Sequence, residues 1–185
     1  MGFRINVRNC KRANVTANTT SSYTIDTPVA MPTLRSIDMT VSAASGELYG
    51  DGEIVAHASK ITGASVAIAI DKLTQADKAA LLGATLSNDG ILTVKTTDTA
   101  PRVAIYFEIE HDDGGFEAYW FLAGQAAPVN VSATQQEANI SYGTEQITVN
   151  FIRREKDKAL YKYGDTDNAD FTSVKQAAFA TNPDT

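Results

Sequence analysis

Five segments of the chain alternate apolar and polar residues, and this pattern constrains the fold more than any other feature. The clearest segment runs from Arg102 to Glu110, where positions 103, 105, 107 and 109 are Val, Ile, Phe and Ile. Alternation with a period of two places successive side chains on opposite faces of a β-strand. The sequence therefore predicts a strand with one apolar face. Its other face is expected to be exposed and carries Arg102, Tyr106, Glu108 and Glu110.

A turn-forming segment, His111-Asp-Asp-Gly-Gly115, follows this strand. Beyond it, residues 116 to 122 alternate again and include the single tryptophan, Trp120. Glycine and aspartate between two alternating segments are typical of a β-hairpin. We therefore expect an antiparallel hairpin with Trp120 in the core.

Three further segments show the same strand period. They are residues 33–41, 65–71 and 144–151. A length of 185 residues with 43% hydrophobic and 21% charged residues suits one soluble globular domain. The sequence thus predicts one mainly β domain spanning residues 1–185.

One short helix is expected between two of these strands. Thr74 can cap its N-terminus because Asp77 stands three residues later, in a variant of the capping box. Gly83 stands where a left-handed C-terminal cap belongs. The predicted helix, Gln75 to Leu82, is too short to be stable alone, so packing must hold it.

Residues 42–60 carry three glycines and little periodicity, which favours a long loop. Loops of this length inside compact domains are usually functional or disordered. The large apolar residues of this loop are Leu48, Tyr49, Ile54 and Val55. A monomer would cover them poorly, so the sequence predicts that the 42–60 loop contacts another subunit.

The chain becomes polar after Arg153, and residues 155–185 are expected to form a C-terminal arm. A short helix is expected around Ser173 to Ala180. The apolar residues of this arm could dock on the parent domain or on a neighbouring subunit, and the sequence leaves both open. We expect the arm and the 42–60 loop to be mobile in the monomer.

Charge and cysteine content exclude several classes of protein. The net charge is −6 and the pI is near 4.9, without a basic stripe, so tight binding of a nucleic-acid backbone is disfavoured. The lone Cys10 excludes an internal disulfide and suits a reducing cytosol. No segment approaches the ~20 apolar residues that span a bilayer, so membrane insertion is not expected.

The sequence also lacks the residue patterns that catalysis requires. The two histidines, His57 and His111, are not in a zinc-binding spacing, and Ser59 lacks a nucleophile-elbow motif. The acidic segment 165–170 begins like a calcium loop but lacks the required glycine and the terminal glutamate. We expect neither an enzyme nor a cofactor.

Several short segments between about Thr24 and Phe179 carry a family resemblance through their order and spacing. They are Tyr-Thr-Ile-Asp-Thr-Pro-Val near the start, Gly-Glu-Leu-Tyr-Gly-Asp-Gly in the loop, Ile-Asp-Lys-Leu-Thr-Gln-Ala-Asp-Lys-Ala-Ala-Leu-Leu-Gly through strand and helix, Ala-Pro-Arg-Val-Ala-Ile-Tyr-Phe from residue 100, Tyr119-Trp120 and Val149-Asn-Phe-Ile-Arg. The chain resembles the major tail tube proteins of long-tailed, siphovirus-type bacteriophages, in the family often called the phi13 type. It departs from the resemblance at Gly50, where a small apolar residue is expected.

The resemblance implies a fold and an assembly. The implied fold has two packed antiparallel β-sheets in a sandwich or barrel, one short flanking α-helix, an extended loop and a C-terminal arm. Such subunits form hexameric rings that stack into a tube, with the loop and the arms bridging the rings. The implied partners are copies of the chain itself and the tape measure, tail terminator and distal tail or baseplate proteins. The subunit would be assembled in the host cytoplasm and reside in the virion.

The acidic composition then suggests how DNA passes through the tube. A lumen of negative potential would keep DNA phosphates from binding its wall. Asp38, Glu108 and Glu110 are the candidate residues facing the lumen.

Two other functions are compatible with the same sequence. One is a monomeric ligand-binding or carbohydrate-binding β-sandwich, against which the scarcity of tryptophan counts. The other is the tube component of a secretion machine, which shares the general fold.

Overall fold

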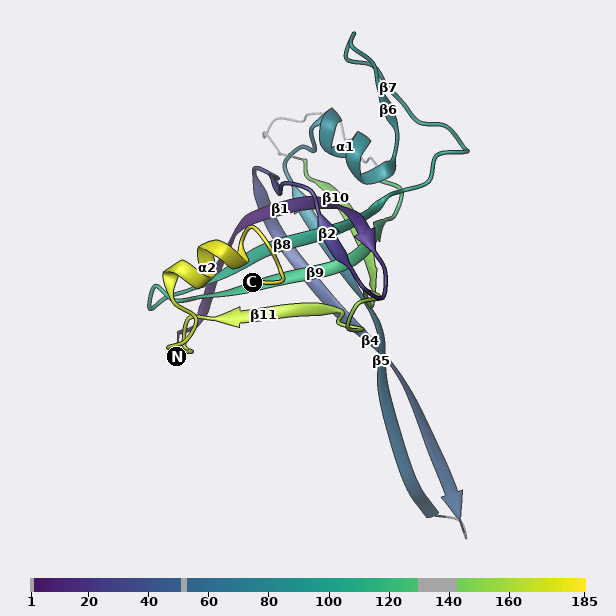
Figure 1. Cartoon of the computed structure of the whole chain (residues 1–185), viewed down its shortest axis with the longest axis vertical. Coiled ribbons are helices and arrows are strands. Elements are labelled where there is room, and N and C mark those ends of the chain that lie inside the picture. The colour runs from purple at the N-terminus through teal and green to yellow at the C-terminus, as the bar shows by residue number, and fades with distance from the viewer. Residues whose placement is uncertain (1, 51–52, 130–142) are drawn as a thin grey trace, which may run out of the picture.

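The computed structural model describes residues 2–50, 53–129 and 143–185. The described part is mainly β, as predicted, with two helices (Figure 1). The strands are β1 (Arg4–Asn18), β2 (Tyr23–Ile25), β3 (Val29–Ala30), β4 (Leu34–Gly50), β5 (Glu53–Ile70), β6 (Thr85–Leu86), β7 (Leu92–Thr93), β8 (Arg102–His111), β9 (Phe116–Ala126), β10 (Glu145–Ile152) and β11 (Tyr161–Asp165). The helices are α1 (Gln75–Leu82) and α2 (Ser173–Phe179).

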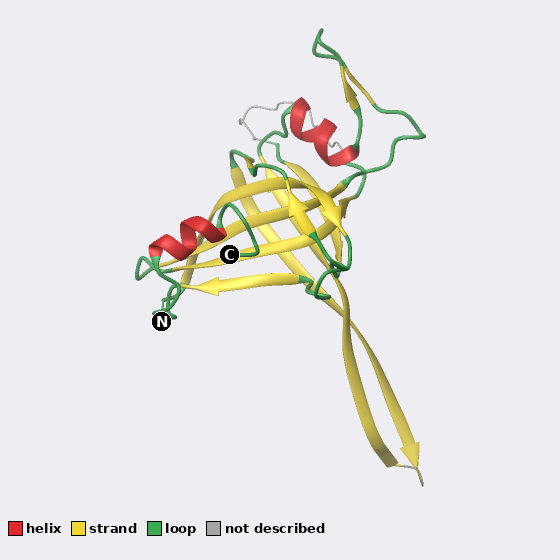
Figure 2. Ribbon diagram, viewed as in Figure 1, coloured by secondary structure: helices red, strands yellow, loops and turns green. Residues whose placement is uncertain are grey.

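The main sheet folds over itself into two layers. Its strand order is β2-β1-β8-β9-β10-β5-β4, with every pair antiparallel. On the edge of β9 away from β8, the first half of the strand pairs with β11 and the second half with β10. The sheet divides at this point. The layer β10-β5-β4 then crosses the layer β1-β8-β9-β11 (Figure 2).

The main core lies between these two layers. On β4 the predicted buried face is incomplete, since Met39 and Val41 are 41% and 37% exposed and Leu34 and Ile37 are only partly buried, as is Ile109 of β8. The other alternating apolar residues that the sequence predicted on β5, β8 and β10 are buried in this core. They are Val66, Ile68 and Ile70 of β5, Val103, Ile105 and Phe107 of β8, and Ile147, Val149 and Phe151 of β10. Tyr119 and Phe121 of β9 complete this core from the second layer. The register of each strand is thereby fixed, because a slip by one residue would expose its apolar set.

The second face of β8 and β9 is buried as well, and the prediction of an exposed polar face on 102–110 was wrong. Tyr106 and Trp120 are fully buried there, under Phe179 of α2 and Ala180. Trp120 lies in a core, as predicted, but in this second one. Alternation in the sequence indicates which residues share a face of the strand. It does not show that α2, about 70 positions further along the chain, covers that face.

Helix α1 has the predicted bounds and caps. The Thr74 hydroxyl accepts a hydrogen bond from the Asp77 backbone N at 3.1 Å, and Gly83 has φ 71°. Packing stabilises this short helix, since Leu81 is fully buried in the main core. The Asp77 carboxylate also accepts a hydrogen bond from the Arg12 guanidinium of β1 at 2.7 Å, between two buried side chains.

The expected 42–60 loop is instead the outer part of a long β-hairpin. β4 and β5 pair from Leu34 opposite Ile70 out to Gly50 opposite Glu53, and the outer part projects away from the domain (Figure 1). Residues 51 and 52 of the expected loop lie outside the described residues. The outer part of the hairpin is rich in Ala, Ser and Gly, and its described residues from 42 to 62 are exposed on both faces. Backbone pairing therefore built two strands without an alternating apolar pattern.

The C-terminal arm, residues 155–185, docks on its own domain. β11 extends the edge of β9, and α2 lies across the second face of the sheet, close to the helix predicted around 173 to 180. Phe179 retains only 6% of its exposure. The sequence left open whether this arm docks on its own domain or on a neighbouring subunit. The structure shows it docked on its own domain.

Candidate assembly surface

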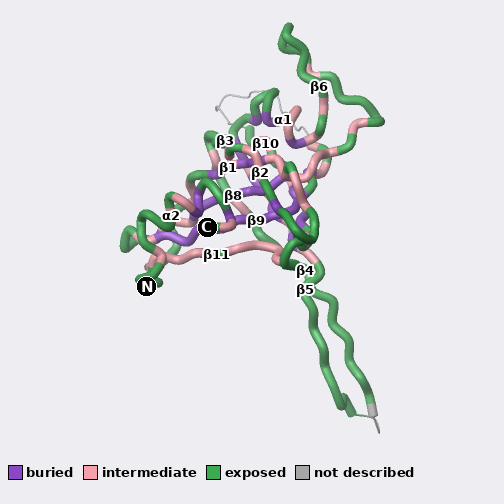
Figure 3. Tube along the Cα trace, in the orientation of Figure 1, coloured by how far each residue is buried: buried purple, intermediate pink, exposed green. Residues whose placement is uncertain are grey.

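The outer part of the β4–β5 hairpin is an extended, uncovered feature of the described structure. Every residue from 42 to 62 whose burial is described is exposed (Figure 3). The four residues singled out in the sequence are each more than half exposed. They are Leu48 at 63%, Tyr49 at 63%, Ile54 at 54% and Val55 at 66%. We call the described residues 46–50 and 53–58 the hairpin tip.

The register places apolar side chains on both faces of the hairpin tip. Tyr49 lies opposite Ile54, so these two share a face, and Leu48 lies opposite Ala56 on the other face. The Tyr49 hydroxyl donates a hydrogen bond to Glu47 Oε2 at 2.7 Å, which orients the ring along the strand. The tip can thus contact a partner through either face.

The outer edge of β4 is also open. β4 ends the main sheet, and no described strand pairs with its second edge. An unpaired edge of this length presents backbone N–H and C=O groups that can pair with another chain. The edge and the tip together form a continuous surface for association.

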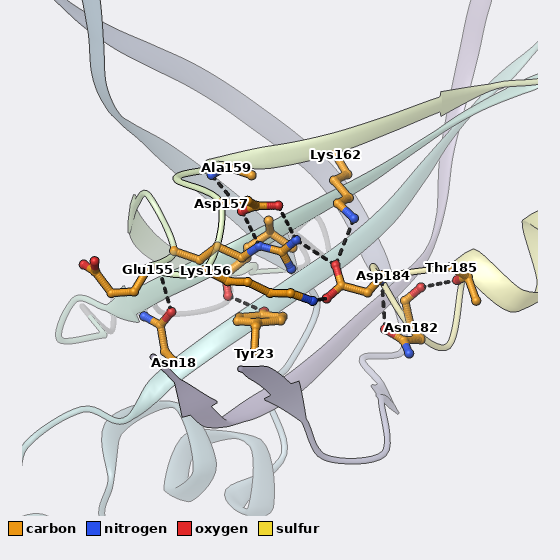
Figure 4. Close-up of polar contacts among 12 residues, drawn as sticks. Asn18, Tyr23, Glu155, Lys156, Asp157, Ala159, Lys162, Asn182, Asp184 and Thr185 are labelled. Atoms are coloured by element: carbon orange, nitrogen blue, oxygen red, sulfur yellow. Dashed lines mark hydrogen bonds and ion pairs between the residues drawn. The ribbon is translucent and has the colours of Figure 1, made fainter. Parts of the chain in front are cut away.

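The C-terminal arm is held by a polar cluster that the sequence analysis missed (Figure 4). The Arg154 guanidinium is 1% exposed, pairs with Asp157 at 2.6 Å and Asp184 at 2.7 Å, and lies over the Tyr23 ring at 4.6 Å. Lys156 and Lys162 also pair with Asp184, at 3.0 and 2.9 Å. The residues come from three separate parts of the chain, so spacing gave no signal for them.

These contacts perturb the two carboxyl groups. The hydrogen bond from Arg154 holds the pKa of Asp157 well below its usual range. Burial alone would raise the pKa of Asp184, but the hydrogen bonds from Arg154 and the two lysines outweigh it and lower that pKa. Both carboxylates are therefore charged partners of the arginine at neutral pH.

The three candidate residues for a lumen do not lie together. Glu108 is 1% exposed and accepts hydrogen bonds from four side chains. The donors are Arg8 at 3.0 Å, Asn9 at 2.7 Å, Tyr106 at 2.6 Å and Gln176 at 3.3 Å. Its prediction as a lumen-facing acid was wrong for this conformation, because β1 and α2 cover it.

Glu110 and Asp38 are more accessible but belong to different layers. The Glu110 side chain is 28% exposed and pairs with Arg8 at 2.8 Å. Asp38 is exposed on β4, on the face opposite Ile37, which packs against the main core. The polar faces of β4 and β8 point away from each other across that core, so one channel wall cannot include both Asp38 and Glu108.

The remaining polar candidates occupy structural positions. His111 is buried and lies 3.1 Å from Glu117, which also accepts hydrogen bonds from Arg4 and Tyr119. His57 lies opposite Glu47 on the exposed hairpin. Within the acidic segment 165–170, side chains accept from nearby backbone N–H groups, as in turns. Among the described residues, no group of three or more His, Cys, Asp or Glu side chains could hold a metal ion.

Comparisons with known proteins leave the family open. No protein-family model matches the chain, and no curated protein sequence matches it significantly. Neither helix of the described part is long and apolar enough to cross a bilayer.

Proposed function

We propose that this chain is a structural subunit that assembles with copies of itself, as the major tail tube protein of a long-tailed bacteriophage. The observation that supports the proposal best is the β4–β5 hairpin, whose tip carries four large apolar side chains that each remain more than half exposed among the described residues. Complete burial of one such side chain contributes roughly 1.5–3 kcal/mol. The tip therefore favours association, and repetition of the contact around a ring multiplies this effect.

The open edge of β4 supports the same assembly. Continuous β-sheets across subunits would satisfy the unpaired backbone groups and remove an edge that otherwise invites aggregation. A projecting hairpin that binds a different surface of the next subunit makes a contact that is not self-complementary. Contacts of this kind generate rings or helical tubes, depending on whether the rotation closes.

The proposal assigns DNA a passive role. Of the three acids considered for the lumen, Asp38 alone is exposed, on the polar face of the layer β10-β5-β4. A wall of this type, in a chain of net charge −6, would repel phosphates and let DNA slide. The tape measure, tail terminator and distal tail proteins remain proposed partners of the tube ends.

Negative-stain microscopy and size-exclusion chromatography of the purified protein over a range of concentrations test the proposal. We expect rings or tubes for the natural chain, and loss of them for Leu48→Ser with Ile54→Ser. Val174→Ser is the matched control, because Val174 is 77% exposed on α2, outside the hairpin. A monomer at every concentration would contradict the proposal and favour the ligand-binding sandwich. If a phage from which this chain has been deleted still forms intact tails, the result would favour the secretion-machine alternative.

A further inference from the structure

The base of the hairpin borders an open pocket that the proposed function does not use. It lies between β5 and the segment that leads into β11, with a volume of about 370 Å³. Its lining residues are Lys60, Ile61, Thr62, Arg153, Lys158, Leu160 and Tyr161. We call this pocket the basal groove. Its floor is apolar, since Leu160 and Tyr161 pack against the main core and Ile61 is 56% exposed.

The rim of the basal groove is positively charged. Lys60, Arg153 and Lys158 are all exposed. Lys158 pairs with Glu155, whereas Lys60 and Arg153 form no ion pair with another described residue. The chain carries a net charge of −6, so two cations that form no ion pair within the described part, next to exposed apolar side chains, differ from the average surface of this protein.

The hairpin tip has the complementary character. Between positions 43 and 59 the sequence contains Glu47, Asp51 and Glu53 but neither lysine nor arginine. Glu47 and Glu53 are exposed beside the apolar side chains of the tip. The tip and the groove are thus both apolar and carry opposite charges, so the two surfaces are complementary.

The tip of a chain cannot reach its own basal groove. Glu53 and Ile61 are eight residues apart on the same paired strand, β5, which separates them by about 26 Å at ~3.3 Å per residue. The β4–β5 ladder holds this separation, because folding the tip back would break its backbone pairs. The occupant must therefore be another molecule.

We propose that the basal groove receives the hairpin tip of a second copy of the chain. This inference rests on the proposed function, since it names the receiving surface of the self-assembly contact. Tip and groove are different surfaces, so a pair of copies joined by one such contact still offers one free tip and one free groove, to which further copies can add. The contact therefore propagates instead of ending at a dimer.

Charge reversal tests the pairing of the two surfaces. Lys60→Glu with Arg153→Glu should reduce the assembled fraction at least tenfold in sedimentation velocity. Adding Glu47→Lys with Glu53→Lys to the same chain should restore assembly. The matched control is Lys72→Glu with Lys95→Glu, which changes the charge equally at exposed positions away from the groove and should assemble like the natural chain. Circular dichroism melting of each monomer identifies a variant that fails to fold.

The outcomes separate this inference from the proposed function. If the natural chain assembles and the groove variant assembles equally well, the groove is not the receiving surface and the proposed function stands. Equal loss of assembly in the Lys72 and Lys95 control, or failure of the reversed tip to rescue a folded groove variant, also overturns the groove. If the natural chain itself never assembles, the proposed function fails first.

Discussion

The indole Nε1 of Trp120 donates a hydrogen bond to the backbone carbonyl of Phe179 at 2.5 Å. This contact joins the middle of β9 to the last turn of α2. The Tyr106 ring packs against both residues in the same cluster, with its centroid 5.2 Å from that of Trp120 and 6.3 Å from that of Phe179. Since Trp120 is the only tryptophan, its fluorescence reports whether the C-terminal arm is docked.

Replacing Phe179 by alanine should detach the C-terminal arm. Loss of a buried phenylalanine typically costs about 3–5 kcal/mol. We expect Phe179→Ala to shift Trp120 emission to longer wavelength and to lower the free energy of unfolding by about that amount. Val174→Ala on the exposed face of the same helix should change neither. An unchanged emission maximum in Phe179→Ala would show that Trp120 does not depend on the arm.

Acid should release the C-terminal arm through Asp157 and Asp184. Both pKa values are lowered in the folded state, so their stabilisation is complete above the unfolded value of about 4 and is lost as pH falls below it. Trp120 fluorescence should therefore change below about pH 4. Arg154→Met should move this transition to higher pH, while Lys158→Met, at an exposed pair, should leave it in place. Identical acid midpoints in all three proteins would contradict this assignment.

Glu108 and Glu110 should respond differently to loss of charge. In Glu108→Gln the new amide N–H₂ group would meet the donors that now surround the carboxylate, which leaves buried groups unpaired at a cost of about 1–3 kcal/mol. Glu110→Gln changes a partly exposed pair worth less than about 1 kcal/mol. Chemical denaturation of the two variants measures the difference. Equal stabilities would show that the Glu108 network does not hold β1 and α2 on β8.

Gly83 should be intolerant of any side chain. Its φ of 71° is left-handed, and a Cβ there would lie 2.4 Å from the Thr99 carbonyl oxygen. The left-handed conformation alone costs a non-glycine residue roughly 1–2 kcal/mol. We expect Gly83→Ala to lower the thermal midpoint clearly. Gly46→Ala, where a Cβ meets no atom within 4 Å, is the control and should leave it unchanged.

Hydrogen exchange should distinguish the hairpin from the C-terminal arm. An isolated two-stranded hairpin is at best marginally stable, so amides between 42 and 60 should exchange rapidly in the monomer and slowly after assembly. The earlier expectation that the arm shares this behaviour is revised, because β11 and α2 are docked. Their amides should be protected in both states, and fast exchange of β11 in the monomer would contradict the docking.

The sequence by itself determined the apolar faces of three strands of the main core and where α1 begins and ends. Alternation at 65–71, 102–110 and 144–151 fixes the apolar face of each strand locally, and Thr74 and Gly83 act within one or two turns of the helix. The four apolar residues of the hairpin tip were also found from the sequence, although inside an expected loop. These signals depend on residues close together in the sequence, so the sequence alone predicts them.

Only the tertiary structure decided what covers each face. Glu108 alternates like an exposed residue, but β1 and α2 bury it, about 100 and 70 positions away along the chain. Arg154 gains its carboxylate partners partly from the C-terminal end, and the hairpin arm pairs without any covered face. Burial and ion pairing of this kind depend on long-range packing free energies, which local periodicity does not encode.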